Sequence, residues 1–206
     1  MAYQDLEIGE DGLARCGWVG TDPEYIRYHD EEWGVKLLGD QKLFEKLSLE
    51  AFQAGLSWIT ILKRRPGFRA AFSNFDIAKV AGFSDVDVER LMLDERIIRN
   101  RAKILATIEN AKITQTMLTE SPGALHDLIW SFQPMSGQRA NACAGDEQER
   151  YQTLAEVPAV TTESEQLSKA LKKLGFKFVG ATTMYALMQS AGLVDDHLAG
   201  CHRSVN

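Results

Sequence analysis

The sequence predicts an all-α protein, and three observations support this fold class. Apolar residues recur at helical spacing in several long segments. Alternation with a period of two, which is typical of half-buried strands, is too short everywhere to predict more than a little sheet. The chain has 206 residues, 45% of them hydrophobic and 25% charged. This length and composition are those of a globular protein with its own core.

The most regular pattern covers residues 40–64, where Asp40 is a suitable N-cap. Gly55 and Ser57 interrupt the pattern and predict two helices with a tight joint rather than one long helix. Pro66 is expected to end the second helix, because proline lacks an N–H and clashes with the preceding turn.

Further helices follow from the same spacing and from capping residues. They are expected at 76–81 after Asp76, 84–93 after Ser84, 96–119 as one helix or two, 123–132, 163–174 and 181–191. Residues 133–162 are rich in Pro, Gly, Ser and Gln and predict a surface loop.

Several function classes are excluded at this stage. No run of 18 or more apolar residues occurs, so we expect no membrane-spanning helix and no membrane partner. The first residues lack the pattern of a secretory signal. Three widely spaced cysteines favour a reducing compartment over a disulfide scaffold, and we therefore expect a cytoplasmic protein.

Charge is unevenly distributed along the chain. The net charge is −6, and residues 1–50 alone carry twelve acids and five bases. Three stretches, 51–75, 96–108 and 168–183, each contain four bases and no acid. Together they could form one positive face for a phosphate backbone. The alternative is three ordinary solvated helix faces.

Two glycines bracket a short turn between the last two predicted helices. Gly175 and Gly180 enclose the segment, and Lys173 and Lys177 add positive charge. Backbone N–H groups at the start of the second helix could bind one phosphate, as helix-hairpin-helix motifs do on DNA. The alternative is a plain connection in which the glycines only cap the two helices.

Cysteine and histidine gather at the two ends of the chain. Cys16 and His29 lie near the start, and His197 and Cys201 are four residues apart near the end. Two thiolates and two imidazoles make a closed tetrahedral zinc site of the structural kind. His202 could compete as a ligand. The alternative is two buried thiols and two surface imidazoles.

Aromatic residues with polar tips are concentrated in the first third of the chain, and one acid lies among apolar residues nearby. The rings are Trp18, Tyr25, Tyr28, Trp33 and Trp58, and the acid is Glu50. Rings around a carboxylate would suit a flat, cationic heterocycle. The alternative is that the rings are core and that Glu50 lies on a helix surface.

These motifs occur together in one known family. The segments RCGW (15–18), DPEYIRYHDEEWGV (22–35), LEAFQAGLSW (49–58), GFKFVG (175–180) and GLVDDH (192–197) closely resemble the 3-methyladenine DNA glycosylase I family. The resemblance runs from about residue 15 to residue 201 and leaves out the start of the chain and much of 133–150.

The resemblance implies a helix-hairpin-helix DNA glycosylase fold and excision of 3-methyladenine from double-stranded DNA by base flipping and N-glycosidic hydrolysis. It implies a structural Zn²⁺ that clips the N- and C-terminal segments together, with Cys16, His29, His197 and Cys201 as ligands. It further implies that Glu50, Tyr25 and Tyr28 contact the base, with Glu50 and Tyr28 catalytic, and that Trp18 and Trp58 stack around it. Gly55 and Leu56 would fill the gap in the duplex, and Lys173, Gly175, Lys177 and Gly180 would contact DNA at the hairpin.

Two positions bear on the reaction. Related glycosylases that also cut the strand carry a lysine shortly after the second hairpin glycine, where this chain has Thr182. We therefore expect a hydrolase without strand cleavage. Asp195 stands where 3-methyladenine enzymes commonly have asparagine. It could stabilise the sugar cation, or it could be a capping residue beside the zinc clip.

The expected organisation is an N-terminal tail (1–14), one catalytic unit of helical subdomains (15–202) and a short C-terminal tail (203–206), in a monomer. The three basic stretches would line one DNA-facing side. Two other readings remain open: a zinc-stapled DNA-binding module without catalysis, and a small-molecule binder that uses the aromatic pocket.

Overall fold

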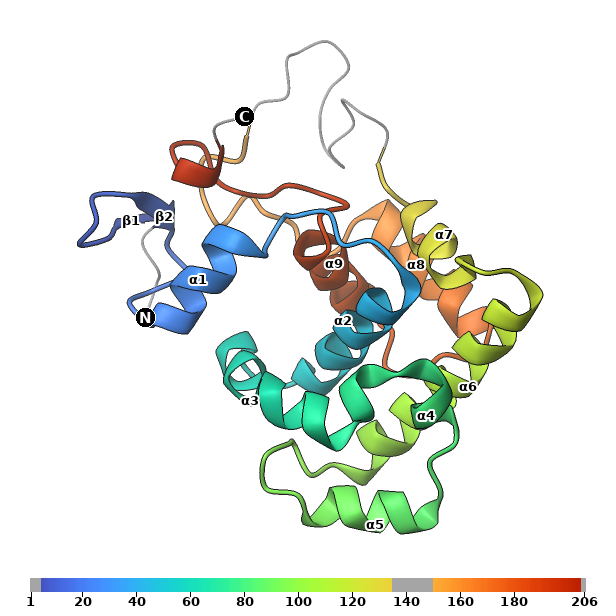
Figure 1. The fold of residues 1–206 in the computed structure, drawn as a ribbon. Coiled ribbons are helices and arrows are strands. Elements are labelled where there is room, and N and C mark those ends of the chain that lie inside the picture. Colours follow the sequence, from blue (N-terminus) through green and yellow to red (C-terminus); the bar gives the residue numbers. More distant parts are fainter. Residues whose placement is uncertain (1–4, 135–149, 205–206) are drawn as a thin grey trace.

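The computed structural model describes residues 5–134 and 150–204, and nearly all of its regular structure is helical (Figure 1). The helices are α1 (Pro23–Glu31), α2 (Asp40–Gln53), α3 (Trp58–Ala71), α4 (Ile77–Ala81), α5 (Asp85–Leu93), α6 (Arg101–Glu120), α7 (Ala124–Trp130), α8 (Thr162–Lys173) and α9 (Ala181–Ser190). Two short 3₁₀ turns, η1 (Ser73–Phe75) and η2 (His202–Ser204), complete them. The predicted all-α class is confirmed. No helix within the described ranges has the length and hydropathy to cross a bilayer.

Helix α2 runs through the middle of the molecule and packs against α3, α6, α7 and α9 (Figure 1). Its residues from Lys46 to Phe52 are all buried. The predicted joint between two helices is confirmed, because α2 ends at Gln53 and α3 begins at Trp58. Gly55 adopts a φ of +84° there, a conformation that glycine accepts without strain.

Two of the three predicted capping residues are confirmed, whereas the prediction for Asp40 is wrong, because Asp40 is the first residue of α2 and Gly39 is its N-cap. One predicted helix start is also wrong. Asp76 and Ser84 cap α4 and α5, and the Ser84 cap is a reciprocal capping box with Asp87. The long helix predicted from 96 begins at Arg101 instead, because the Asn100 side chain accepts a hydrogen bond from the Lys103 N–H and caps it there.

The prediction that Pro66 ends its helix is also wrong, since α3 continues to Ala71 with Pro66 inside it. Proline removes one helix hydrogen bond. The turns on either side bury Leu62, Arg65 and Phe68, and this packing holds the helix together across the missing bond.

The N-terminal region contains elements that the sequence patterns did not predict. Strands β1 (Leu6–Ile8) and β2 (Ala14–Cys16) form a short antiparallel hairpin, much of it within the expected tail. Helix α1 follows, with Asp22 as its N-cap and Pro23 in its first turn. Figure 1 shows the hairpin and η2 at the same end of the molecule, where β2 contacts η2.

An ion pair fixes α1 to α3. Both guanidinium nitrogens of Arg65 donate hydrogen bonds to Glu32, at 2.5 and 2.8 Å, just beyond the end of α1. Burial alone would raise the pKa of Glu32, but the hydrogen bonds and charge of Arg65 outweigh burial and hold the pKa at about 2.

Glu32→Gln is expected to lower the free energy of unfolding at neutral pH by about 1–2 kcal/mol, because a hydrogen bond to a charged group is lost. The unfolded carboxyl titrates near 4.5 and the folded one near 2. The contribution of Glu32 is therefore complete above pH 4.5 and is lost as the pH falls towards 2. Urea unfolding between pH 7 and 2 should show a shallower acid decline for the variant. Glu89→Gln, which breaks the exposed pair with Arg101, is the matched control and should change stability little.

Gly192→Ala is expected to destabilise the fold strongly. Gly192 has a φ of +73°, and a Cβ atom there would lie 2.6 Å from the Val35 carbonyl carbon and 2.7 Å from the Lys36 nitrogen. The segment around Val35 cannot retreat freely, because Gly34 and Leu37 donate backbone hydrogen bonds to the last turn of α9 and the residue after it. We expect a loss of about 3 kcal/mol in urea unfolding. Gly12→Ala, with a similar φ and nothing within 4 Å, should lose only about 1 kcal/mol.

Candidate functional site

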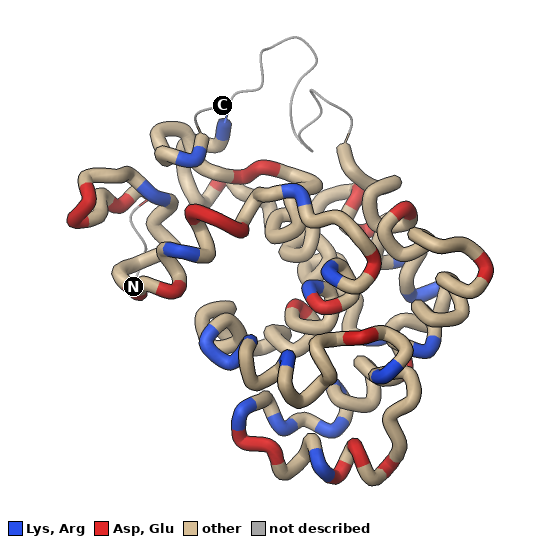
Figure 2. The backbone as a smooth tube through the Cα atoms, viewed as in Figure 1, with Lys and Arg blue, Asp and Glu red and all other residues tan. Residues whose placement is uncertain are grey.

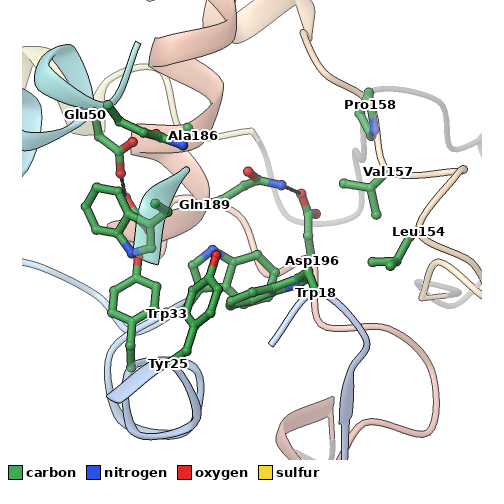
Figure 3. A pocket seen from close by; sticks show the side chains of 14 residues that line it. Trp18, Tyr25, Trp33, Glu50, Leu154, Val157, Pro158, Ala186, Gln189 and Asp196 are labelled. Atoms are coloured by element: carbon green, nitrogen blue, oxygen red, sulfur yellow. Dashed lines mark hydrogen bonds between the residues drawn. The ribbon is translucent and has the colours of Figure 1, made fainter. Parts of the chain in front are cut away.

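A cavity of about 340 Å³ lies where α1, α2, α3, α9 and the C-terminal segment meet (Figure 3). Its wall is aromatic and polar on one side and apolar on the other. The lining residues are Trp18, Tyr25, Tyr28, Trp33, Glu50, Gln53, Trp58, Leu154, Val157, Pro158, Ala186, Gln189, Ser190 and Asp196. All five residues that the sequence assigned to a base pocket, Trp18, Tyr25, Tyr28, Glu50 and Trp58, are among them.

The rings form a continuous aromatic wall. The Trp18 ring centroid lies 5.0 Å from those of Tyr25 and Trp33. The Tyr28 centroid lies 5.5 Å from that of Trp58. Figure 3 shows Tyr25, Trp18 and Trp33 side by side below the carboxylate of Glu50. Such a wall offers ring faces to a planar or cationic ligand.

Glu50 is a buried carboxylate at the inner end of this cavity, with an exposed fraction of 3%. The Ser190 hydroxyl, from α9, donates a hydrogen bond of 2.9 Å to Glu50 Oε1. Burial raises the pKa of Glu50 to about 7, and the Lys46 charge and the Ser190 hydrogen bond oppose that rise. A carboxylate that titrates near neutrality inside a cavity is typical of a functional site.

Tyr28 is fully buried beside Glu50. Burial raises its pKa well above 10, and the negative charge of Glu50 raises it further. The phenol therefore stays protonated at neutral pH and keeps its hydrogen-bond donor.

Trp58 brings a second donor. Its indole Nε1–H is buried and has no hydrogen-bond partner among the described residues. Buried donors are nearly always satisfied, so an unpaired one in a cavity wall is suited to an acceptor on a ligand.

The structure adds site residues that sequence reasoning missed. Asp196 is buried and accepts a hydrogen bond of 2.6 Å from the Tyr185 hydroxyl. It accepts a second, of 2.9 Å, from Gln189 Nε2 (Figure 3). Tyr185 and Gln189 are four residues apart on α9 and so share a face. A tyrosine and a glutamine four residues apart, followed by the acidic pair 195–196, are the pattern in the sequence from which this hydrogen-bonded group could have been predicted.

Asp195, the predicted catalytic candidate, does not line the cavity. Its carboxylate pairs with Arg150 at 2.8 Å and accepts a hydrogen bond from the His197 backbone N–H at 3.2 Å. These contacts are those of a capping residue next to the cysteine and histidine cluster.

The four predicted metal ligands come together in one buried cluster. The candidate ligand atoms of Cys16, His29, His197 and Cys201 all lie within 4.8 Å of one another. The Cys201 Sγ atom lies 3.5 Å from His29 Nε2 and 3.6 Å from His197 Nδ1, and Cys16 Sγ lies 3.9 Å from the same His197 atom. A tetrahedral ion with Zn–S bonds of about 2.3 Å and Zn–N bonds of about 2.0 Å separates its S and N ligands by roughly 3.5 Å, so the cluster could hold a metal.

Outer contacts fix both imidazoles of this cluster. His29 Nδ1 lies 2.7 Å from Asp30 Oδ1, and His197 Nε2 lies 3.2 Å from the Trp33 carbonyl oxygen. Each histidine thus points its other nitrogen at the cysteines. His202, the predicted competitor, pairs with Asp30 at 2.9 Å instead.

The cluster also supports the aromatic wall. The rings of Trp18 and His29 are 5.4 Å apart, and those of Trp33 and His197 are 4.6 Å apart. The wall of the cavity therefore rests directly on the cysteine and histidine cluster.

The predicted DNA-contacting residues lie at two places next to α6. Leu56, with an exposed fraction of 41%, follows Gly55 in the α2–α3 joint. Lys103 of α6 holds that joint by donating hydrogen bonds to the carbonyl oxygens of Phe52 and Ala54, at 2.8 and 2.7 Å.

The hairpin between α8 and α9 adjoins the same helix. Asn110 of α6 accepts a hydrogen bond from the Lys177 N–H at 2.8 Å and donates one of 3.1 Å to the Lys177 carbonyl oxygen. Gly175 adopts a φ of +99°, and Gly180 is the N-cap of α9. Lys173 is the last residue of α8.

The three basic stretches meet around α6, but much of their charge is paired. Acids outside the three stretches, some distant and some only two to four residues away, pair with Lys63, Arg65, Arg69, Arg96, Arg99, Arg101 and Lys169. Figure 2 shows acidic and basic residues close together along these segments. The local positive excess is thus smaller than the sequence count indicates, and a single DNA-facing basic side stays a prediction.

Comparison with known proteins finds two relatives whose names agree with each other. The chain is 49% identical over 189 residues to DNA-3-methyladenine glycosylase 1 of Escherichia coli (strain K12), covering 92% of this chain and 96% of that protein. It is 48% identical to DNA-3-methyladenine glycosylase of Haemophilus influenzae, covering 91% and 96%.

Solved structures agree in fold. A crystal structure of 3-methyladenine DNA glycosylase I matches with a TM-score of 0.82 at 46% identity, covering 91% of this chain and 98% of that one. A Staphylococcus aureus structure that describes 3-methyladenine recognition matches with a TM-score of 0.81 at 33% identity, covering 93% and 97%. The methyladenine glycosylase family model matches residues 18–204. With the cavity and the cluster described above, these similarities show that the chain belongs to the methyladenine glycosylase family.

Proposed function

We propose that this chain excises 3-methyladenine from alkylated double-stranded DNA by hydrolysing its N-glycosidic bond. The observation that carries the proposal is the buried Glu50 carboxyl, with a pKa of about 7, facing an aromatic cavity. The relatives named above support it, and a similar solved structure contains 3-methyladenine itself.

The chemistry of the base suits this cavity. Methylation at N3 makes the adenine cationic, so it is already a good leaving group and needs little acid catalysis. Glu50 attracts the cation and accepts hydrogen bonds from it, while the faces of Trp18 and Trp58 stack around the ring. Tyr25 and Tyr28 contact its edge.

The proposed reaction breaks one bond at the sugar and forms another. The bond between sugar C1′ and the base breaks, and the base leaves with the electron pair and becomes neutral. Water adds to C1′ from the opposite face and loses a proton. Glu50 and Tyr28 act by holding the cationic base in the orientation in which the bond breaks. Their attraction for the base falls once the base is neutral.

The base must leave the helical stack before this cavity can hold it. Leu56, exposed beside Gly55, is placed to fill the gap in the duplex. The hairpin contacts a phosphate through Gly175, Gly180 and the N–H groups of the first turn of α9, with Lys173 and Lys177 nearby.

The proposed enzyme is a hydrolase without strand cleavage. Strand-cleaving relatives need a lysine amine that reaches the sugar. Thr182 occupies the corresponding position, and no lysine is among the described residues that line the cavity. For Asp195, the pairing with Arg150 and the cap on His197 favour a structural role over stabilisation of the sugar cation.

We further propose that Cys16, His29, His197 and Cys201 hold a structural Zn²⁺. The donor set is charge-balanced, its spacing fits a tetrahedral ion, and outer contacts orient both imidazoles. The bound ion would hold the start and the end of the chain together behind the aromatic wall.

Glu50→Gln is expected to lower the single-turnover release of 3-methyladenine from methylated duplex DNA by roughly 10–100-fold, because the negative charge that strengthens the hydrogen bond to the cationic base is lost. Release of the free base is measured by chromatography. Glu120→Gln, an exposed residue at the end of α6, is the control and should match wild type. Absence of release by the wild-type chain would overturn the enzyme in favour of a DNA-binding module. Absence of salt-dependent DNA binding as well would favour a small-molecule binder.

Elemental analysis of the purified protein should give about one zinc per chain, and Cys201→Ser should lose it. The thermal midpoint of wild type should fall on chelation, whereas that of Cys201→Ser should be low and insensitive to chelator. His126→Asn, which removes a histidine outside the cluster, should keep both zinc and stability. A metal-free wild type of unchanged stability would refute the structural ion.

A further inference from the structure

A second cavity, of about 380 Å³, lies next to the aromatic one and is lined by charged residues. Lys46, Glu32 and Arg65 line it, and none of them lines the aromatic cavity. Ser190 lines both cavities, so it lies between them.

Lys46 is held close to the base site without entering it. It lies four residues before Glu50 on α2, so the two side chains share one helix face. Its Nζ atom lies 5.0 Å from the centroid of the Tyr28 ring and 5.1 Å from that of Trp58. A buried ammonium over two ring faces is stabilised by cation–π attraction.

The two polar groups nearest to Glu50 act in the same direction. The Ser190 hydroxyl donates to the carboxylate at 2.9 Å, and the Lys46 charge attracts its ionised form. Both lower the pKa of Glu50 against the effect of burial and leave it at about 7. Both groups therefore favour the ionised carboxylate against burial, and a neutral acid attracts a cationic base less than a carboxylate does.

We propose that Lys46 and Ser190 are positioning residues of the excision site, which orient the Glu50 carboxyl and increase its ionised fraction before a base enters. The proposal rests on the proposed function for its consequence, since an ionised Glu50 is what selects a cationic base. An ordinary core residue at position 46 would not couple to Glu50, whereas a buried ammonium one turn away does.

The charged and titratable groups that surround Lys46 and Glu50 come from several elements. From α1 and its end come Tyr28 and Glu32, from α3 comes Arg65, and from the C-terminal segment comes Asp196. Burial lowers the pKa of Lys46, while Glu50 and Glu32 raise it. Arg65 is paired with Glu32 at 2.5 Å, so it opposes the ionisation of Lys46 less than an unpaired guanidinium would.

The direct test follows the carboxyl of Glu50 by carbon-13 NMR in glutamate-labelled protein, with its signal assigned from Glu50→Gln. In Lys46→Met, which keeps the length of the side chain and removes the charge, the midpoint should rise by about one pH unit. Lys46→Arg should restore most of the wild-type midpoint. Ser190→Ala should raise the midpoint independently, because it removes the hydrogen bond to the ionised form.

Lys42→Met is the matched control, since it removes an exposed lysine from the same helix one turn earlier. Its Glu50 midpoint should equal that of wild type. A folded Lys46→Met with an unchanged midpoint overturns the role of Lys46, and an unchanged Ser190→Ala overturns that of Ser190. If Lys46→Met does not fold, Lys46→Gln carries the same comparison.

Excision rates test whether the ionisation of Glu50 controls the release of the base. The acid limb of single-turnover 3-methyladenine release should move up in Lys46→Met by the same interval as the NMR midpoint, and at pH 6 the rate should fall several-fold below that of wild type. A moved midpoint with an unmoved limb overturns the proposed consequence. Wild type that releases no base contradicts the proposed function instead, and the NMR result stands apart from it.

Discussion

The burial of α2 from Lys46 to Phe52 is the constraint on which the site depends. Every residue of this stretch is buried, so each polar side chain there needs a partner inside the protein. Ser48 donates to the Phe44 carbonyl oxygen at 2.7 Å. Glu50 accepts a hydrogen bond from the Ser190 hydroxyl, and the Lys46 ammonium lies over the rings of Tyr28 and Trp58. The raised pKa of Glu50 thus follows from helix packing, because burial disfavours the charged form of its carboxyl.

The aromatic half of the cavity depends on a different contact, between the two ends of the chain. Trp18 and Trp33 flank α1, and their rings touch His29 and His197. Cys16 and Cys201, both fully buried, bring β2 and the C-terminal segment to the same place. A loss of order in this cluster would therefore reach the cavity through ring packing, even though none of its four residues lines the cavity.

Local signals in the sequence predicted most helices, because caps such as Asp76 and Ser84 act within a few residues. Where tertiary packing decided, the predictions were wrong, as at Pro66, which buried neighbours keep helical. The aromatic set around Glu50 was predictable as a group, since its members share unusual chemistry. The roles of Lys46 and Ser190 were not predictable from the sequence. Ser190 lies 140 positions after Glu50, and only the packing of α9 against α2 brings the two side chains together.

The positive charge available to DNA could not be predicted from the sequence either, because it depends on which acids the fold brings to the basic stretches. The bases of three acid-free stretches meet acids from elsewhere, such as Glu45 for Arg69, so the sequence count overstates the field that DNA would meet. Contacts to the phosphate backbone carry no base sequence information in any case. Discrimination has to arise where charge is least screened, which is the buried carboxylate of Glu50. Under the proposed function, a cationic base entering there gains an attraction that a neutral base lacks, so the methylation would itself supply the charge that the cavity recognises.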